Sequence, residues 1–430
     1  MPTDRQASPE RALSKADEVA GLVMRRFEEL PRKRKPAVRD TGVREWTTLS
    51  GIVAEREGEM RCICLATGVK CLPASKVRVA NGNGIHDWHA EVLAMRALNH
   101  FLLTECRAIL ESPAYDSFVV TRGAAGGRWP FEVRAGVRLY MYASEAPCGD
   151  ASMELTMSAQ EDPTPWSIPP PPSTTTPATA EADADADAPP APSLPGREYF
   201  SRLGIVRRKP SRPDAPPSLS KSCSDKLALW QATSLLSSLT SLLVAPAGAY
   251  LSGIVVPEPS FVPAAFARCF VDRMAPLRAS MAKEEERAGG YSYAEMEPLT
   301  TRLPFEFSRQ SGDAPATSMA PCNVSAVWTP VLEEGLVGGV LQGKKAFADR
   351  GASAVSRRGM WVLAREVAGA LAACGGDAGP TEALAARSYG ELKATGLLEG
   401  RRRVKRMARE EALKGWVRNT GGEEFGLEVS

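Results

Sequence analysis

Residues 87–91 read Asp-Trp-His-Ala-Glu, and the apolar residues after this stretch recur at helical spacing. The pattern predicts a helix over about residues 89–106, whose apolar residues include Val92, Leu93, Met95, Leu98, Phe101 and Leu102. His89 then stands at the helix start, and Glu91 lies two residues further on. This spacing can place a carboxylate beside a metal ligand without making that carboxylate a ligand.

Two short cysteine motifs follow further along the chain. Residues 146–150 read Ala-Pro-Cys-Gly-Asp, and residues 222–226 read Ser-Cys-Ser-Asp-Lys. An imidazole and two thiolates hold zinc in a tetrahedral site and leave the fourth position for a water, whose pKa the metal lowers. The chain therefore contains the residue set of a zinc hydrolytic deaminase. Its members are Glu91 as the catalytic proton carrier and, as metal ligands, His89, Cys148 and Cys223.

The third ligand is the least determined of the set. Zinc deaminases commonly carry Pro-Cys-x-x-Cys after His-x-Glu, but Ala151 stands where the second cysteine of that motif belongs. The ligand must come from elsewhere, and Cys223 in its polar motif is the candidate. The residues alone leave this assignment open.

The three motifs, in this order, resemble those of the adenosine deaminases acting on RNA and their tRNA-specific relatives. Residues 46–53 and 67–73 are similar to the opening strands of that family, and Arg-Arg-Lys-Pro at residues 207–210 is similar to its tRNA-specific branch. The resemblance covers roughly residues 40–157 and 197–430. It implies an α/β fold, with a cytidine-deaminase-like three-layer α/β/α core and a helical C-terminal extension.

The resemblance also implies a reaction and a substrate. The expected reaction is zinc-dependent hydrolysis of adenosine to inosine at position 37 of eukaryotic tRNA-Ala, next to the anticodon, with the anticodon stem-loop as the partner. Only about 40 residues precede the catalytic region, too few for a double-stranded RNA-binding domain, which favours the tRNA-specific branch. Lys70 matches a family position near the RNA; a structural hairpin lysine is the alternative.

Other functions remain open at this point. Within the family, the alternatives are another RNA substrate or an inactive relative that binds zinc and RNA; Glu91 argues against the inactive form, because a structural zinc site has no use for a proton carrier. A mononucleoside or cytidine deaminase is disfavoured by the incomplete Pro-Cys-x-x-Cys motif and by the length of 430 residues.

In the RNA-editing relatives, inositol hexakisphosphate is buried behind the zinc site, and the resemblance implies this cofactor here. Six phosphates require many Lys and Arg side chains that would otherwise be costly to bury. Met95 and Leu229 stand where the editing enzymes have arginines, and residues 401–405 could compensate. A salt bridge to a neighbouring carboxylate is the alternative role for Lys226. The residues that match the polyanion pocket are Arg96, Lys226, Tyr389, Lys393 and Trp416.

Composition limits the partners. A net charge of +2 is not that of a general nucleic-acid binder, so RNA contacts must use local clusters such as residues 32–35, 207–212 and 401–409, of which the first is more simply a solvated face. Nine cysteines without a secretory signal predict a reducing compartment, the nucleus or the cytoplasm. The uncharged stretch 230–257 predicts a buried helix (about 224–244) and a strand (about 249–256) rather than a membrane span. No obligate protein partner is evident.

The chain divides into an N-terminal helix with a basic linker (1–40) and a deaminase domain (41–430). A Pro-, Ala- and Asp-rich segment at about 158–196 predicts a disordered insertion in that domain. Alternating residues predict strands, and the one at 137–144 would deliver Cys148. The remaining predicted elements are strands at 46–56 and 60–66 and helices at 9–30, 355–373, 381–396 and 399–416.

Overall fold

The computed structural model describes residues 13–122, 127–159, 194–196, 202–209, 215–283, 289–309 and 318–427. Apart from its two ends, the insertion predicted at 158–196 lies outside the described residues. All the residues singled out above as site residues lie inside them.

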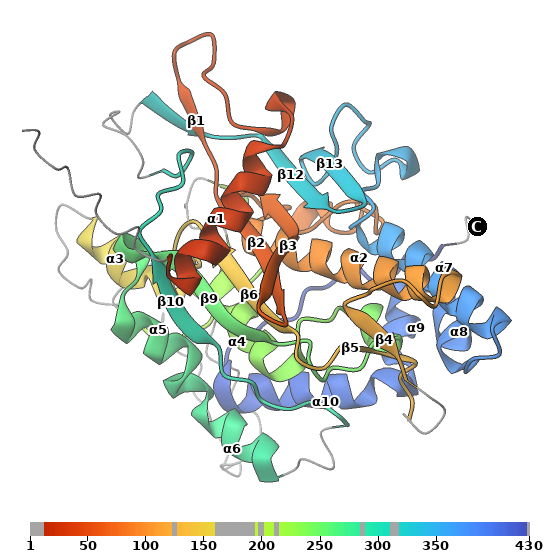
Figure 1. Cartoon of the computed structure of the whole chain (residues 1–430). Helices are drawn as coiled ribbons and strands as arrows, with labels where there is room; N and C mark the ends of the chain where they lie inside the picture. Colours follow the sequence, from red (N-terminus) through yellow and green to blue (C-terminus); the bar gives the residue numbers. More distant parts are fainter. Residues whose placement is uncertain are drawn as a thin grey trace, which may run out of the picture.

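An eight-stranded mixed sheet forms the centre of the molecule (Figure 1). The hairpin formed by its strands at residues 49–56 and 59–67 turns at Glu57 and Gly58, which both have positive φ angles. From edge to edge the strands are β10 (Glu297–Thr301), β9 (Leu251–Pro257), β6 (Arg138–Ala143), β2 (Leu49–Arg56), β3 (Glu59–Thr67), β12 (Val324–Thr329), β13 (Leu332–Val337) and β14 (Val340–Leu341). The β6–β9–β10 part is parallel and the remainder antiparallel.

Within the described residues, three two-stranded sheets lie outside the main sheet. They are β1 (Arg44–Trp46) with β11 (Met319–Pro321), β4 (Val119–Thr121) with β5 (Phe131–Val133), and β7 (Leu194–Pro195) with β8 (Arg207–Arg208). The helices are α1 (Lys15–Glu28), α2 (Ala90–Glu111), α3 (Met153–Ser158), α4 (Cys223–Thr233), α5 (Pro263–Phe270), α6 (Ala275–Lys283), α7 (Arg357–Ala373), α8 (Gly379–Leu384), α9 (Tyr389–Ala394) and α10 (Glu399–Met407).

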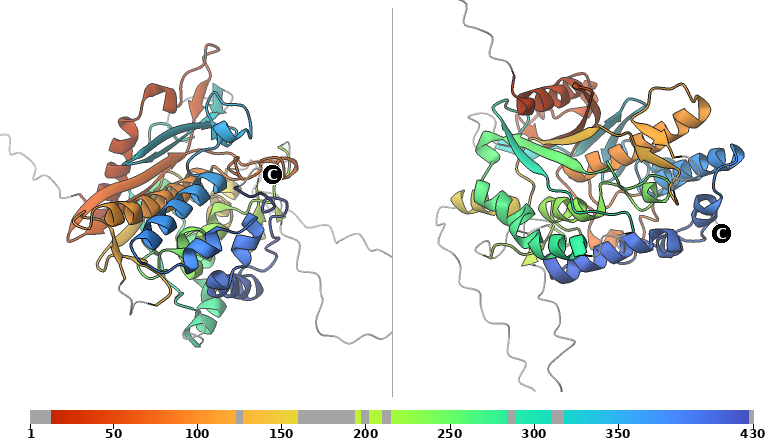
Figure 2. Two further views of the ribbon diagram at one scale, coloured as in Figure 1. Left: turned by 90° about the vertical axis from the view of Figure 1, so that its right-hand side faces the viewer. Right: turned by 60° about the horizontal axis from the view of Figure 1, so that its bottom comes forward.

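Helices cover both faces of the main sheet, because strand residues alternate between two cores. Leu49 and Val53 of β2 face α1, whereas Ile52 belongs to the larger core beneath α2. A Cβ on Gly51 would lie 2.6 Å from Val23 of α1, so the helix reaches the sheet only because this position is glycine. Figure 2 shows α1 on one side and α2 with the C-terminal helices on the other. The expected three-layer α/β fold is confirmed.

Three predicted helices break or end well before the expected residue. The one expected at 399–416 ends as an α-helix at Met407 and continues only as a π-helical turn, Ala408–Ala412. The helix expected at 224–244 ends at Thr233, because Ser234 adopts φ 57° and the leucine-rich residues after it pack irregularly into the core. The helix expected at 381–396 is two short helices, α8 and α9. The second helix begins at its own cap, where the Ser388 hydroxyl accepts a hydrogen bond from the Glu391 amide. None of the helices in the described ranges has the length and apolar character needed to cross a membrane.

Candidate active site

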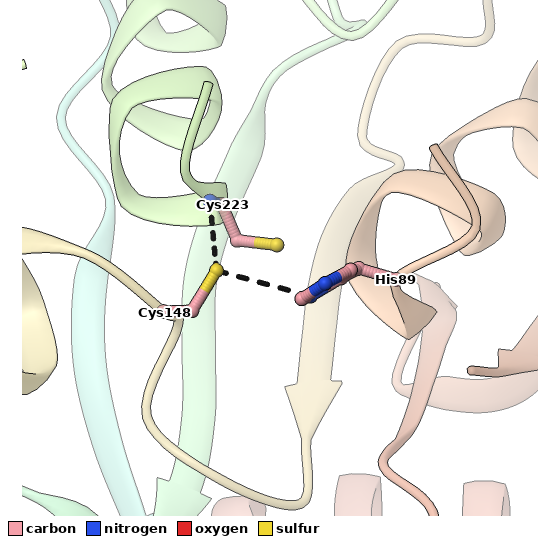
Figure 3. Close-up of side chains that lie close together, drawn as sticks. All are labelled: His89, Cys148 and Cys223. Atoms are coloured by element: carbon pink, nitrogen blue, oxygen red, sulfur yellow. Dashed lines mark hydrogen bonds between the residues drawn. The ribbon is translucent and has the colours of Figure 1, made fainter. Parts of the chain in front are cut away.

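Three separate elements bring the predicted metal ligands together. His89 is the N-cap residue of α2, Cys148 follows β6 in a loop, and Cys223 is the first residue of α4. Their ligand atoms all lie within 4.8 Å of one another. Figure 3 shows the two sulfurs and the imidazole converging, with Cys148 Sγ 3.8 Å from His89 Nδ1 and 3.4 Å from the amide of Cys223.

Contacts between the Cys148 loop and the start of α4 set this geometry. Ser224 Oγ donates to the carbonyls of Pro147 (2.8 Å) and Cys148 (2.9 Å). Gly149 has φ 106°, and a Cβ there would lie 2.3 Å from Ser222 Oγ, so only glycine allows this close approach. The two thiols are therefore held against each other by local packing.

The donor set fits zinc. Two thiolates and one imidazole that converge within this distance can serve three of the four positions of a tetrahedral site. A hydrogen bond from the Cys223 thiol lowers the pKa of Cys148 well below its usual value, while burial raises the pKa of Cys223. One ready thiolate beside a second thiol is a suitable starting state for metal binding, which releases the remaining proton.

Glu91 lies in the first turn of α2 and is buried. Burial, followed by the charge of Cys148, raises the pKa of its carboxyl group. The side chain is therefore electrostatically coupled to the ligand cluster, although it is not one of the clustered donors. A carboxyl group with a raised pKa at this place is suited to holding and releasing a proton.

A buried network that the motifs did not predict surrounds Cys223. Lys209 Nζ lies 3.2 Å from Cys223 Sγ and forms a salt bridge with Asp87 (2.9 Å). Lys226 also donates to Asp87 and to Ser220 Oγ (2.7 Å), and the Ser220 hydroxyl donates to Asp87 (2.6 Å). Lys226 thus makes the carboxylate salt bridge that was its alternative role. No spacing in the sequence connects residues 87 and 209, although Asp87 lies two positions before His89 and Lys209 belongs to the Arg-Arg-Lys-Pro stretch at residues 207–210.

A cavity of about 640 Å³ opens onto the ligand cluster. Lys70 lies at this cavity, where its Nζ donates to Asn323 Oδ1. Cavity residues include the ligands His89 and Cys148, the indoles of Trp46 and Trp88, and the apolar side chains of Val69, Pro73, Met153, Met319 and Pro321. Basic residues line the cavity as well: Lys70, Arg207, Arg208, Lys209 and Arg309. A wall that combines apolar surface with polar groups is typical of a small-molecule or nucleobase site.

The residues matched to the polyanion pocket occupy one basic region. Arg96 Nη1 donates to the Val355 carbonyl (3.1 Å), and Tyr389 stacks on Phe425 with ring centroids 5.3 Å apart. Lys393 forms an ion pair with Glu423. The ammonium group of Lys221 lies 5.7 Å from the centre of the Trp416 ring.

Burial and neighbouring cations together lower the pKa values of several basic side chains in this region. Burial, followed by the charge of Arg357, lowers the pKa of Arg96 to about 10, and burial, followed by Lys226, lowers that of Lys221 to about 7. Burial, followed by Arg401, lowers the pKa of Lys405 well below its usual value. Both ring nitrogens of buried His86, which is close to Arg357 and Arg96, lack hydrogen-bond partners within the described part of the chain. A polyanion fits such a region, since it would relieve the repulsion between these cations.

In two of the predicted basic clusters, one arginine side chain is buried rather than exposed to solvent. Arg207 is fully buried, and its guanidinium group donates to the carbonyls of Arg202 (2.6 Å) and Gly196 (3.1 Å). Arg401 is buried too and donates to the carbonyls of Thr233 and Leu236. These arginines tie chain segments together, so the sequence clusters overstate the charge that is open to RNA.

Comparison with known proteins identifies the family. The family model of the adenosine-deaminase (editase) domain matches residues 64–420. The chain belongs to the adenosine-deaminase (editase) domain family. The editase domain contains all the predicted ligands and Glu91, whereas α1 and Trp46 precede the matched region.

The chain is similar in sequence to several named deaminases. The chain is 35% identical over 419 residues, 95% of both chains, to tRNA-specific adenosine deaminase 1 of Schizosaccharomyces pombe. It is 34% identical over 248 residues, 56% of this chain and 58% of the relative, to tRNA-specific adenosine deaminase 1 of Saccharomyces cerevisiae. It is 27% identical over 260 residues, 59% of this chain and 35% of the relative, to the double-stranded RNA-specific editase Adar of Drosophila melanogaster. The predicted family and enzyme class are confirmed.

Proposed function

We propose that this editase domain converts adenosine in tRNA to inosine by zinc-dependent hydrolysis, at position 37 of tRNA-Ala. The observation that carries the proposal is the convergence of His89, Cys148 and Cys223, coupled to Glu91, at one cavity. The 35% identity to a named tRNA-specific adenosine deaminase over 95% of both chains supports the choice of RNA.

His89, Cys148 and Cys223 would hold the zinc ion. When bound, zinc lowers the pKa of a coordinated water to about 7, which makes attack on a purine ring feasible at neutral pH. In the net reaction, adenosine and water give inosine and ammonia: a C–O bond forms at C6 and the C6–N bond breaks.

The protein side chains supply proton transfer and position. Glu91, with its raised pKa, would take a proton from the attacking water, deliver it to N1 of the adenine ring, and then transfer the second water proton to the leaving amino group, which departs as ammonia. Lys209 contacts the Cys223 sulfur and is itself held by Asp87, so the two residues together position Cys223. The apolar part of the cavity wall, which includes Val69, Trp88 and Met153, would pack against the reacting ring.

The anticodon stem-loop is the proposed partner. Its loop bases are unpaired, so a base can be extruded into a cavity at low cost. Lys70, which lies at the cavity, would contact a phosphate of the loop. No obligate protein partner is proposed.

Inositol hexakisphosphate is the proposed second cofactor. Arg96, Lys226, Tyr389, Lys393 and Trp416 would line its pocket, and their neighbours Lys221, Arg357 and Lys405 add the charge that Met95 and Leu229 do not supply. The ring nitrogens of His86, which have no hydrogen-bond partner among the described residues, support the proposal that a ligand binds in this region. Phosphate analysis of the denatured pure protein tests this directly, and protein without inositol phosphate would contradict it.

Two further proposals concern the division of the chain into domains and the cellular compartment. The division into residues 1–40 and 41–430 marks a change in sequence rather than a separate folding unit, because α1 packs on the main sheet. All nine cysteines are free thiols, which supports a reducing compartment, the nucleus or the cytoplasm. Fractionation of cells that express the tagged full-length chain would locate it.

The test of the function is inosine formation in transcribed eukaryotic tRNA-Ala. The native protein is expected to produce inosine at position 37, and the Glu91→Ala variant is expected to retain zinc and produce none. Bound zinc without inosine formation by the native protein would contradict this substrate and point to another RNA or to an inactive relative.

A further inference from the structure

Trp46 ends β1 at the edge of the cavity. It pairs with Pro321 in the small parallel sheet of β1 and β11, outside the main sheet (Figure 1). The Trp46 carbonyl accepts a hydrogen bond from the Cys322 amide (2.8 Å), and the amide of Thr47 donates to the Phe307 carbonyl (2.9 Å). The backbone at Trp46 is thus held on both sides, while the half-buried indole lines the same cavity as His89 and Cys148.

Arg309 makes a cation–π contact with this indole. Its guanidinium carbon lies 5.9 Å from the Trp46 ring centre, and the side chain is exposed and lines the cavity. The Arg309 amide donates to Glu145 Oε1 (3.2 Å). Glu145 precedes Cys148 by three residues, so their Cα atoms are at most about 11 Å apart. The pair is therefore tied to the loop that carries a predicted metal ligand.

The cavity offers more room than the reacting base needs. Its volume of about 640 Å³ exceeds that of one purine ring, and Met319 and Pro321 of β11, the strand that pairs with β1, line it together with Trp46. Unpaired RNA bases are bound by stacking on aromatic rings and arginine planes. The Trp46 indole and the exposed Arg309 guanidinium group provide both kinds of surface in the cavity that His89 and Cys148 line.

We propose that Trp46 and Arg309 form a platform on which the nucleotide adjacent to the target adenosine stacks. This inference rests on the proposed function, because it assigns the second nucleotide of an RNA substrate. The platform holds the loop while the target base enters the cavity, so it acts on RNA binding and not on the chemical step.

A second arginine–tryptophan pair provides a matched control. Arg26 lies over Trp328 at 4.5 Å, but this pair lies beside the core beneath α1 and does not line the cavity. Replacing Arg26 by alanine removes the same kind of contact away from the substrate. Trp46→Phe retains a stacking ring, whereas Trp46→Ala and Arg309→Ala remove one half of the platform each.

The experiment measures binding of an anticodon stem-loop RNA to the full-length protein in a Glu91→Ala background, which prevents turnover. 2-Aminopurine replaces the nucleotide on the 5′ or the 3′ side of the target, and quenching of its fluorescence reports stacking. A second pair of RNAs has an abasic residue at the same positions. Zinc content and thermal unfolding confirm that each variant is folded.

For one of the two neighbours, we expect Trp46→Ala and Arg309→Ala to lose the quenching and to bind at least about fivefold more weakly, the lower end of what one base–aromatic stack provides. Trp46→Phe retains most of the binding, and Arg26→Ala binds like the parent. The abasic RNA binds parent and variants equally. Unchanged binding and quenching in both alanine variants, or an equal loss on intact and abasic RNA, would overturn the platform. Failure of the proposed function is seen separately, as native protein that forms no inosine.

Discussion

Lys209 Nζ lies 3.2 Å from Cys223 Sγ and also 3.1 and 2.9 Å from the two carboxylate oxygens of Asp87. Burial opposes the charge on this lysine, but Asp87 and Cys223 outweigh burial and keep the pKa of Lys209 well above its usual value. Lys209 and Lys226 likewise hold the pKa of Asp87 well below its usual value, although burial acts to raise it. The positively charged ammonium group of Lys209 therefore contacts the sulfur of Cys223, a predicted zinc ligand.

Replacing Lys209 by methionine is expected to weaken zinc binding by about 10- to 100-fold, the usual effect of losing a group that orients a ligand. It also weakens the pairing of buried Asp87, and breaking such a pair costs about 3–5 kcal/mol of unfolding free energy. Competition with a chelator and urea unfolding measure the two effects. Lys76→Met, at an exposed lysine, is the control, and unchanged zinc affinity in Lys209→Met would refute the orienting role.

Cys223→Ala is expected to lose stoichiometric zinc, because only two of the three converging donors remain. Cys106→Ala is the matched control, since Cys106 is also a fully buried free thiol but lies in the C-terminal third of α2 and outside the ligand cluster. It should retain zinc and lose only about 1 kcal/mol of stability. Metal analysis of the purified variants decides between them. Zinc retained at full stoichiometry in Cys223→Ala would mean that the third ligand is another residue.

Lys405 provides a test of the polyanion by the sign of a stability change. Burial and the neighbouring Arg401 and Lys393 disfavour its charge in the folded chain. Without a polyanion, Lys405→Met removes repulsion and should stabilise the protein; with a bound polyanion, it removes an attraction and should destabilise the purified protein by about 1–2 kcal/mol. We expect destabilisation in denaturant unfolding, with exposed Lys414→Met unchanged. A more stable Lys405→Met protein would argue against the cofactor.

His100 is expected to contribute to acid sensitivity. It is buried in α2, and burial, followed by the charge of Arg107, lowers its pKa to about 4. The unfolded chain protonates this histidine below about pH 6.5 and the folded chain only near pH 4, so stability is lost as the pH falls through this window. His100→Gln should lose about 3 kcal/mol less between pH 7 and 4 than the parent. Parallel unfolding curves across this range would contradict the assignment.

Local patterns predicted the elements that carry the chemistry. The apolar period after His89 predicted α2, and the alternation before Cys148 predicted β6, because both depend on side chains a few residues apart. The helix expected at 224–244 was wrong because the backbone turn at Ser234 depends on tertiary packing and not on apolar spacing.

The sequence by itself determined which residue types are available for catalysis: one His-x-Glu at a predicted helix start and two cysteines in short local motifs. Only the tertiary structure decided that Cys223 meets Cys148, that Lys209 stands behind it, and that Arg309 lies over an indole at the same cavity. The physical reason is range. Helix and strand periods are written in neighbouring residues, whereas contacts between distant elements arise when the two faces of the sheet are packed, and no spacing along the chain encodes them.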